Sequence, residues 1–86
     1  MRLIFSKRAW EDYQFWIQTD KATLKRINLL IQDAARNPFE GLGKPEPLRH
    51  QLAGFGSRRI TAEHRFVYTI EGEDLLIAQL RFHYGP

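Results

Sequence analysis

The spacing of apolar residues changes near the middle of the chain, and this change limits what the chain can fold into. Before residue 37, apolar residues recur at helical spacing, at Leu24, Ile27, Ile31 and Ala34. After residue 56 they alternate with polar residues, as they do in strands with one buried face. A helical half followed by a strand half predicts an α+β fold, with two N-terminal helices packed on one face of a twisted, mainly antiparallel sheet.

Each predicted helix begins at a residue that can cap it. A short strand at residues 2–5 comes first, and Ser6 is the expected N-cap of a helix that runs to about Gln18. Asp20 can cap the second helix, which ends before Pro38 because the residue preceding a proline is pushed out of the helical region. One face of the first helix is expected to carry Trp10, Tyr13 and Ile17.

The second half predicts three strands after a structured loop. Residues 40–56 are rich in Gly and Pro and form the loop, with a short strand at residues 48–52. The strands are expected at residues 57–62, 65–70 and 74–84.

The last hairpin is expected to turn through the three residues Glu71–Glu73. A loop with an odd number of residues places two apolar rows on one face, at Phe66, Tyr68 and Ile70 and at Leu76, Ala78, Leu80 and Phe82. This register puts Arg65, Arg81 and His83 together on the opposite, more polar face, and it sends Tyr84 to the apolar side.

Length and composition exclude several classes of protein. The 86 residues predict one domain, residues 1–86. The chain has no cysteine, which excludes disulfides and thiolate metal sites and favours the reducing cytoplasm. Its histidines, His50, His64 and His83, are too scattered for a metal site, so we expect no metal and no other cofactor. No apolar run is long enough for a signal peptide or a membrane span.

Positive charge is concentrated in residues 41–65, which include most of the predicted loop, the strand expected at residues 57–62 and the start of the next strand. The formal net charge is +3, and residues 41–65 contain two glutamates, Glu46 and Glu63, against five cations, Lys44, Arg49, Arg58, Arg59 and Arg65. Four of these cations are arginines, whose planar guanidinium groups suit phosphate. This pattern favours an anionic partner that carries phosphate.

One carboxylate stands out in this basic segment. Glu46 lies between Pro45 and Pro47, which fix φ on both sides of it. A stiffly held carboxylate, several guanidinium groups and the imidazole of His83 are the groups that metal-free cleavage of RNA requires. In that reaction a base activates the ribose 2′-hydroxyl, cations stabilise the charged phosphorane and an acid protonates the leaving 5′-oxygen.

These residues resemble a known family. The stretch "KPEPLRHQLAGFGSRRITAEHRFVY" (residues 44–68) and the closing "RFHY" are similar to the YoeB (Txe/YoeB) family of the RelE superfamily of bacterial toxins, and the similarity covers essentially the whole chain. The resemblance implies a RelE-like, microbial ribonuclease-like fold. It also implies an mRNA interferase that cuts messenger RNA in the ribosomal A site and is neutralised by an acidic, YefM-like antitoxin. A homodimer is expected as well.

The resemblance also assigns roles to single residues. It implies that Glu46 is the general base, Arg65 stabilises the transition state and His83 is the general acid. Substrate binding is expected from Lys44, Arg49, Arg59 and Tyr84. Two features depart from the family pattern: position 49 is often lysine, and Gly85-Pro86 follow a His-Tyr pair that commonly ends the chain.

Two other functions remain open from the sequence alone. The same basic face suits a module that binds RNA or the ribosome without cutting, and such binding weakens steeply with salt. A superfamily relative that poisons another target through protein contacts is the third possibility, although protein binding does not require an acid–base pair.

Overall fold

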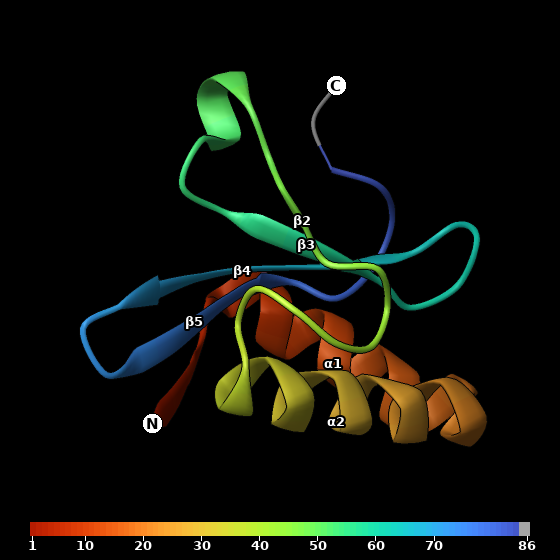
Figure 1. Ribbon diagram of the computed structural model, residues 1–86. Helices are drawn as coiled ribbons and strands as arrows, with labels where there is room; N and C mark the ends of the chain where they lie inside the picture. Colours follow the sequence, from red (N-terminus) through yellow and green to blue (C-terminus); the bar gives the residue numbers. More distant parts are fainter. Residues whose placement is uncertain (85–86) are drawn as a thin grey trace.

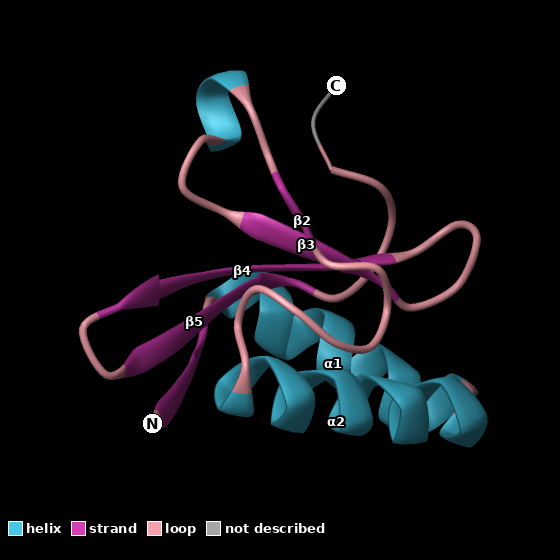
Figure 2. Ribbon diagram, viewed as in Figure 1, coloured by secondary structure: helices cyan, strands magenta, loops and turns pink. Residues whose placement is uncertain are grey.

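The computed structural model describes residues 1–84, which form two layers (Figures 1 and 2). Helices α1 (Lys7–Thr19) and α2 (Lys21–Arg36) cover one face of a five-stranded sheet with the order β1-β5-β4-β3-β2. The strands are β1 (Arg2–Phe5), β2 (Glu46–Pro47), β3 (Gly56–Arg59), β4 (Arg65–Glu71) and β5 (Asp74–Gln79), and a 3₁₀ helix, η1 (His50–Leu52), follows β2. Only β1 and β5 pair in parallel among the described strands, which confirms the expected α+β fold.

Both helices begin at the predicted residues because a side chain caps each of them. The Ser6 hydroxyl accepts a hydrogen bond from the Ala9 amide at 3.0 Å, and the Asp20 carboxylate accepts one from the Thr23 amide at 3.0 Å. The helix α2 ends before Pro38, also as predicted. Within residues 1–84, no helix has both the length and the apolar character needed to cross a bilayer.

The face of α1 with Trp10, Tyr13 and Ile17 is only partly buried. Trp16 lies in the core at 6% exposure, whereas Trp10 is 51% exposed and Ile17 is 40% exposed. The face that carries Trp10, Tyr13 and Ile17 is therefore not the one that the sheet buries. The sheet covers the neighbouring strip of the helix, which carries Ala9 and Trp16.

The turn between β4 and β5 is tighter than predicted. Glu71 pairs with Asp74, so the loop contains only Gly72 and Glu73, and the predicted three-residue loop is wrong. Gly72 has a φ of +60°, which glycine adopts without steric cost. Two-residue turns with positive φ match the twist of the strands that they join, and this match favours the shorter loop.

The shorter loop shifts the residues that β5 buries. Leu75 and Ile77 face the helices at 0% and 1% exposure, whereas the predicted Leu76 and Ala78 do not reach the core. The predicted register is therefore wrong in the half of the hairpin that lies next to the turn.

Farther from the turn, a β-bulge restores the predicted alternation of inward and outward side chains. Tyr68 pairs with Ile77 while Val67 pairs with Gln79, so Ala78 has no partner. The extra residue turns Gln79 toward the outer face, by which we mean the face of the sheet opposite the helices.

Arg81 does not join Arg65 and His83 on the outer face, and that prediction is wrong. Its guanidinium carbon lies 3.5 Å from the ring centroid of Phe15, which belongs to α1. The strict alternation ends with β5 at Gln79, so the residues beyond it no longer follow strand geometry.

Arg58 is buried and organises the loop after α2. Its exposure is 0%, and its five N–H groups donate to the Tyr68 hydroxyl, the Asp33 carboxylate and the carbonyl oxygens of Asn37, Glu40 and Leu42 at 2.6–3.1 Å. The expectation that Arg58 adds to a phosphate-binding surface is therefore wrong. Its charge holds residues 37–42 in place, and these residues lead into β2.

The predicted strands around this loop are displaced. The strand expected at residues 48–52 is wrong: the extended segment is β2, and a φ of +58° at His50 interrupts any continuation. The strand expected at residues 57–62 ends at Arg59, because the amides of Ile60 and Thr61 both turn back to the His64 carbonyl oxygen.

We predict that Arg58→Met lowers the free energy of unfolding by about 3–5 kcal/mol, as removal of one partner from a buried ion pair does. Methionine keeps much of the apolar length but leaves the buried acceptors without a donor. Urea denaturation measures the change. The matched control is Arg59→Met, which changes an exposed neighbour and should stay within about 0.5 kcal/mol of wild type. Equal losses in both variants would contradict this account.

Candidate active site

The outer face of the sheet carries the guanidinium groups of β3 and β4. Side chains alternate along each strand, and Arg58 and Phe66 point toward the helices. Arg59 and Arg65 therefore point outward, and they lie directly opposite each other in the β3–β4 pair. Two positive charges share this end of the face.

Glu46 reaches the same face from the edge of the sheet. It pairs with Ser57 of β3, and residues paired in this way direct their side chains to one side. Its neighbours Pro45 and Pro47 restrict the backbone, and the missing N–H of Pro47 is tolerated because β2 is an edge strand. An exposed carboxylate is thus carried on a stiff segment.

Arg65 is anchored by one end of its guanidinium group. Its Nη1 donates to the carbonyl oxygens of Thr61, Ala62 and His64 at 2.8–3.2 Å. The residue is 8% exposed, and its Nε and Nη2 make no hydrogen bond within residues 1–84. A fixed cation with free donors results.

The last described residues, Leu80–Tyr84, form a segment that we call the hook. Figure 1 shows it leaving β5 and rising on the side of the sheet that carries β2, away from the helices. The chain turns at Phe82, whose φ is +66°. This turn explains why Tyr84 does not lie on the apolar side, where simple alternation placed it. Gly85 and Pro86, which depart from the family pattern, lie outside the described residues.

Tyr84 makes the contact that joins the hook to β2. Its hydroxyl donates to the Glu46 Oε1 at 2.8 Å. His83 is exposed beside it, with the two ring centroids 6.5 Å apart. Within residues 1–84 no hydrogen bond joins the His83 ring to Glu46 or Arg65.

The Tyr84 hydroxyl titrates differently from an ordinary phenol. The hydrogen bond to Glu46 raises the pKa of Tyr84, and desolvation and the charge of Glu46 act in the same direction. Ser57 and the charge of Arg65 oppose this effect without cancelling it. Tyr84 therefore stays protonated near neutral pH and continues to donate to Glu46.

The other predicted binding residues make no side-chain hydrogen bond to this pair within residues 1–84. Lys44, Arg49 and Arg59 are exposed, and none makes an ion pair within residues 1–84. Lys44 has a φ of +53° immediately before Pro45, which sets the direction in which β2 begins.

Ser57 belongs to this site but was not predicted from the sequence. It is 2% exposed and contributes to the environment of the Tyr84 hydroxyl. The available signal was its position two residues before Arg59 in a predicted strand, which places both side chains on one face.

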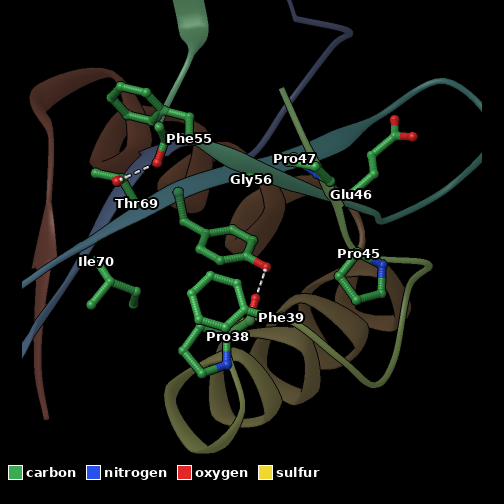
Figure 3. Close-up of a pocket in the computed structure, with 11 residues that line it drawn as sticks. Pro38, Phe39, Pro45, Glu46, Pro47, Phe55, Gly56, Thr69 and Ile70 are labelled. Carbon is green, nitrogen blue, oxygen red and sulfur yellow. Dashed lines mark hydrogen bonds between the residues drawn. The ribbon is translucent and has the colours of Figure 1, made fainter. Parts of the chain in front are cut away.

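A separate pocket of about 440 Å³ opens beside β2 (Figure 3). Its walls are mainly apolar, and two of its polar groups are already paired: the Tyr68 hydroxyl donates to the Pro38 carbonyl oxygen at 2.6 Å, and the Thr69 hydroxyl donates to Gly54 at 2.7 Å. Figure 3 shows the Glu46 carboxylate directed away from Pro38. Glu46 is one of the residues that line this pocket, but its carboxylate is not directed toward the Pro38 side of it. Among residues 1–84, no group of three His, Cys, Asp or Glu side chains is arranged to hold a metal ion.

The chain is similar along nearly its whole length to one family of bacterial toxins. A family model described as "YoeB-like toxin of bacterial type II toxin-antitoxin system" matches residues 5–84. Toxin YoeB of Escherichia coli K12 is 58% identical over 84 residues, which cover 98% of this chain and 100% of that protein.

Two solved structures from Staphylococcus aureus are also similar. The structure of a YoeB dimer matches with a TM-score of 0.91 and 45% identity, covering 98% of both chains. A heterotetrameric YoeB-YefM toxin-antitoxin complex matches with a TM-score of 0.90 and 45% identity, again covering 98% of both chains.

We predict that Glu46→Gln lowers the pKa of Tyr84 toward its ordinary value. The phenolate form is disfavoured while a carboxylate accepts the phenol hydrogen bond, and the neutral amide removes that charge. Ultraviolet titration of tyrosinate measures the shift, and Tyr84→Phe identifies which transition belongs to Tyr84. Glu73→Gln, in the β4–β5 turn, is the control and should leave the transition in place. An unchanged transition in Glu46→Gln would contradict the assignment.

Proposed function

The chain belongs to the YoeB-like toxins of bacterial type II toxin–antitoxin systems, and we propose that it is an endoribonuclease that cuts messenger RNA in the ribosomal A site. The proposed reaction uses no metal: the ribose 2′-hydroxyl attacks the adjacent phosphate with the help of an acid and a base. Cutting the message stops translation. DNA lacks the attacking hydroxyl and is not a substrate.

Three side chains divide the chemistry in this proposal. Glu46 takes the proton from the 2′-hydroxyl, and its Oε2 makes no hydrogen bond within residues 1–84 and is open to that proton. The free donors of Arg65 stabilise the charge on the phosphorane. His83 protonates the leaving 5′-oxygen, and each proton transfer is worth about 10²–10⁴-fold in rate.

One observation carries the proposal: the Tyr84 hydroxyl lies 2.8 Å from the Glu46 carboxylate. The two residues are 38 positions apart, and their contact brings the C-terminal His-Tyr pair to the proline-flanked base. Arg65 lies on the same face of the sheet. These contacts support the proposal that Glu46, Arg65 and His83 act on one phosphodiester.

Substrate binding is assigned to the surrounding groups. Lys44, Arg49 and Arg59 are exposed cations that can contact the phosphates on either side of the cut. Tyr84 orients the substrate, since its ring stands beside the base and the acid. The ribosome supplies the rest of the site by presenting the message.

The proposed partner that restrains this activity is an acidic, YefM-like antitoxin in the cytoplasm. The S. aureus relative was solved in a complex with YefM. An anionic peptide suits the exposed cations of the outer face, and its binding there would block access to Glu46.

We predict that Glu46→Ala and His83→Ala each reduce cleavage by about 10²–10⁴-fold, because each removes one proton-transfer group. Primer extension on messenger RNA in a translating extract measures the cut. Arg65→Ala should also abolish it.

Circular dichroism establishes that these variants remain folded, and Glu73→Ala serves as an exposed control that keeps full activity. A message with a single 2′-deoxynucleotide at the mapped cut site should resist cleavage. Salt-sensitive binding with no cut product, even from the wild type, would indicate the non-catalytic binding module. Wild-type cleavage by a folded His83→Ala variant would refute the assignment of the acid.

We propose that the toxin forms a homodimer, as the S. aureus relative solved as a dimer does. Trp10 of α1 is 51% exposed and stacks on Tyr13 with ring centroids 6.1 Å apart, which gives a flat apolar patch. Sedimentation at low micromolar concentration should give a dimer, and Trp10→Ser should shift it toward monomer. A wild-type monomer under these conditions would contradict the proposal.

A further inference from the structure

His64 holds the hook at its turning point. Its Nδ1 accepts a hydrogen bond from the Phe82 amide at 2.8 Å. The next residue, Arg65, donates its own amide to the Phe82 carbonyl oxygen at 3.0 Å. Both backbone polar groups of Phe82 are therefore fixed by two consecutive residues, one of which is the proposed catalytic arginine.

Phe82 needs this support because its backbone is strained. Its φ of +66° lies in the left-handed region, which is an unusual place for an aromatic residue. Directly before it, Arg81 lies against Phe15 on the helix side, and two residues after it, Tyr84 meets Glu46 on the outer face. The strained residue is thus the point at which the chain crosses from one side of the sheet to the other.

Gln79 fills the inside of the hook. Its side chain is 6% exposed, and its Nε2 lies 2.8, 3.0 and 2.8 Å from the carbonyl oxygens of Arg81, Phe82 and His83. One amide group thereby holds three consecutive carbonyl groups, including that of the proposed acid. Within residues 1–84, the only other side-chain hydrogen bond to these acceptors is a long one of 3.4 Å from Arg8 to the Arg81 carbonyl oxygen.

We call His64 and Gln79 together the clamp, and the clamp contacts the hydrophobic core through His64. The His64 ring meets the buried Trp16 edge-on, with ring centroids 5.0 Å apart. Trp16 donates to the Leu80 carbonyl oxygen at 2.8 Å, and Asp12 accepts from the Leu80 amide at 3.0 Å. The hook is therefore fixed to α1 at its first residue and to the clamp at its turn.

We propose that His64 and Gln79 are positioning residues, which hold Phe82 and the hook so that His83 stands ready to protonate the leaving oxygen. The inference rests on the proposed nuclease function. Neither side chain reaches the outer-face carboxylate, so each acts only through the backbone that carries His83. Misplacing a catalytic group by about 1 Å can cost on the order of 10²-fold in rate, which is the effect that the clamp prevents.

The two contacts can be removed with little change in side-chain volume. Asparagine carries an oxygen at nearly the place of the histidine Nδ1, whereas glutamine carries its oxygen one bond farther out, near the Nε2. His64→Asn should therefore keep the bond to the Phe82 amide, and His64→Gln should lose it. Gln79→Met keeps the length of the side chain and removes the donors.

The experiment compares two leaving groups in messenger RNA bound to programmed ribosomes, under single-turnover conditions. One message has the ordinary linkage at the mapped cut site, and the other has sulfur in place of the 5′-oxygen. A thiolate leaves without protonation, because thiols are far stronger acids than alcohols. The sulfur linkage therefore removes the need for the acid but keeps the need for Glu46 and Arg65.

On the ordinary linkage, His64→Gln and Gln79→Met should cut about 10–100-fold more slowly than wild type, while His64→Asn stays within about threefold. On the sulfur linkage, the two slow variants should recover to within about threefold of wild type, as His83→Ala should, and Glu46→Ala should remain slow. A purely structural role would slow both linkages equally, and that result, or no loss at all, would overturn the proposal.

A measurement without catalysis separates damage to the fold from loss of the clamp. Thermal unfolding shows whether each variant is folded at the assay temperature, and amide NMR relaxation shows whether residues 82–84 have become mobile. Rigid residues 82–84 in His64→Gln and Gln79→Met would overturn the clamp even if the nuclease function holds. Failure of the wild type to cut either linkage would instead overturn the nuclease function, and the clamp would lose its catalytic purpose with it.

Discussion

The burial of one arginine determines how the rest of the molecule is arranged. Arg58 has no exposed surface, and all five of its N–H groups are used within the fold. A buried charge is tolerated only when it is paired and fully hydrogen-bonded, so residues 37–42 have to close around it. The loop that follows then reaches β2 in one arrangement, and Glu46 takes its place at the edge of the sheet. The amide of Arg59 strengthens this arrangement by donating to the Gly43 carbonyl oxygen at 2.7 Å.

The proposed active site is built from two segments, and different parts of the fold hold each segment in place. Glu46 is held by the Arg58 loop and by pairing with β3, while His83 and Tyr84 are held by the hook and by α1. The Tyr84 hydroxyl joins the two segments directly. Precision in the site therefore depends on residues far from it, which fits the need of acid–base catalysis for groups placed in advance.

The sequence predicts the elements well and the details of their connection less well. Helix starts at Ser6 and Asp20 follow from local capping chemistry, and the layer order follows from apolar spacing. The hairpin register does not follow, because a two-residue turn and a bulge at Ala78 change the alternation twice. For the site, alternation correctly places Arg65 on the polar face of the sheet. The expectations for Arg58 and Arg81 fail for different reasons. Arg58 follows the alternation, but its side chain is buried on the helix side by its hydrogen bonds, whereas Arg81 lies beyond the end of β5 and stacks on Phe15.

The parallel pairing of β1 with β5 has a consequence for how the molecule forms. Residues 2–5 pair with residues 74–77, so β1 cannot complete its pairing until a strand about 70 residues farther along the chain has been synthesised. Contacts between residues so distant in sequence are slow to form, because the loop between them loses entropy on closure. A nascent copy therefore lacks the pairing of β1 with β5 until residues 74–77 have been synthesised and are free to fold.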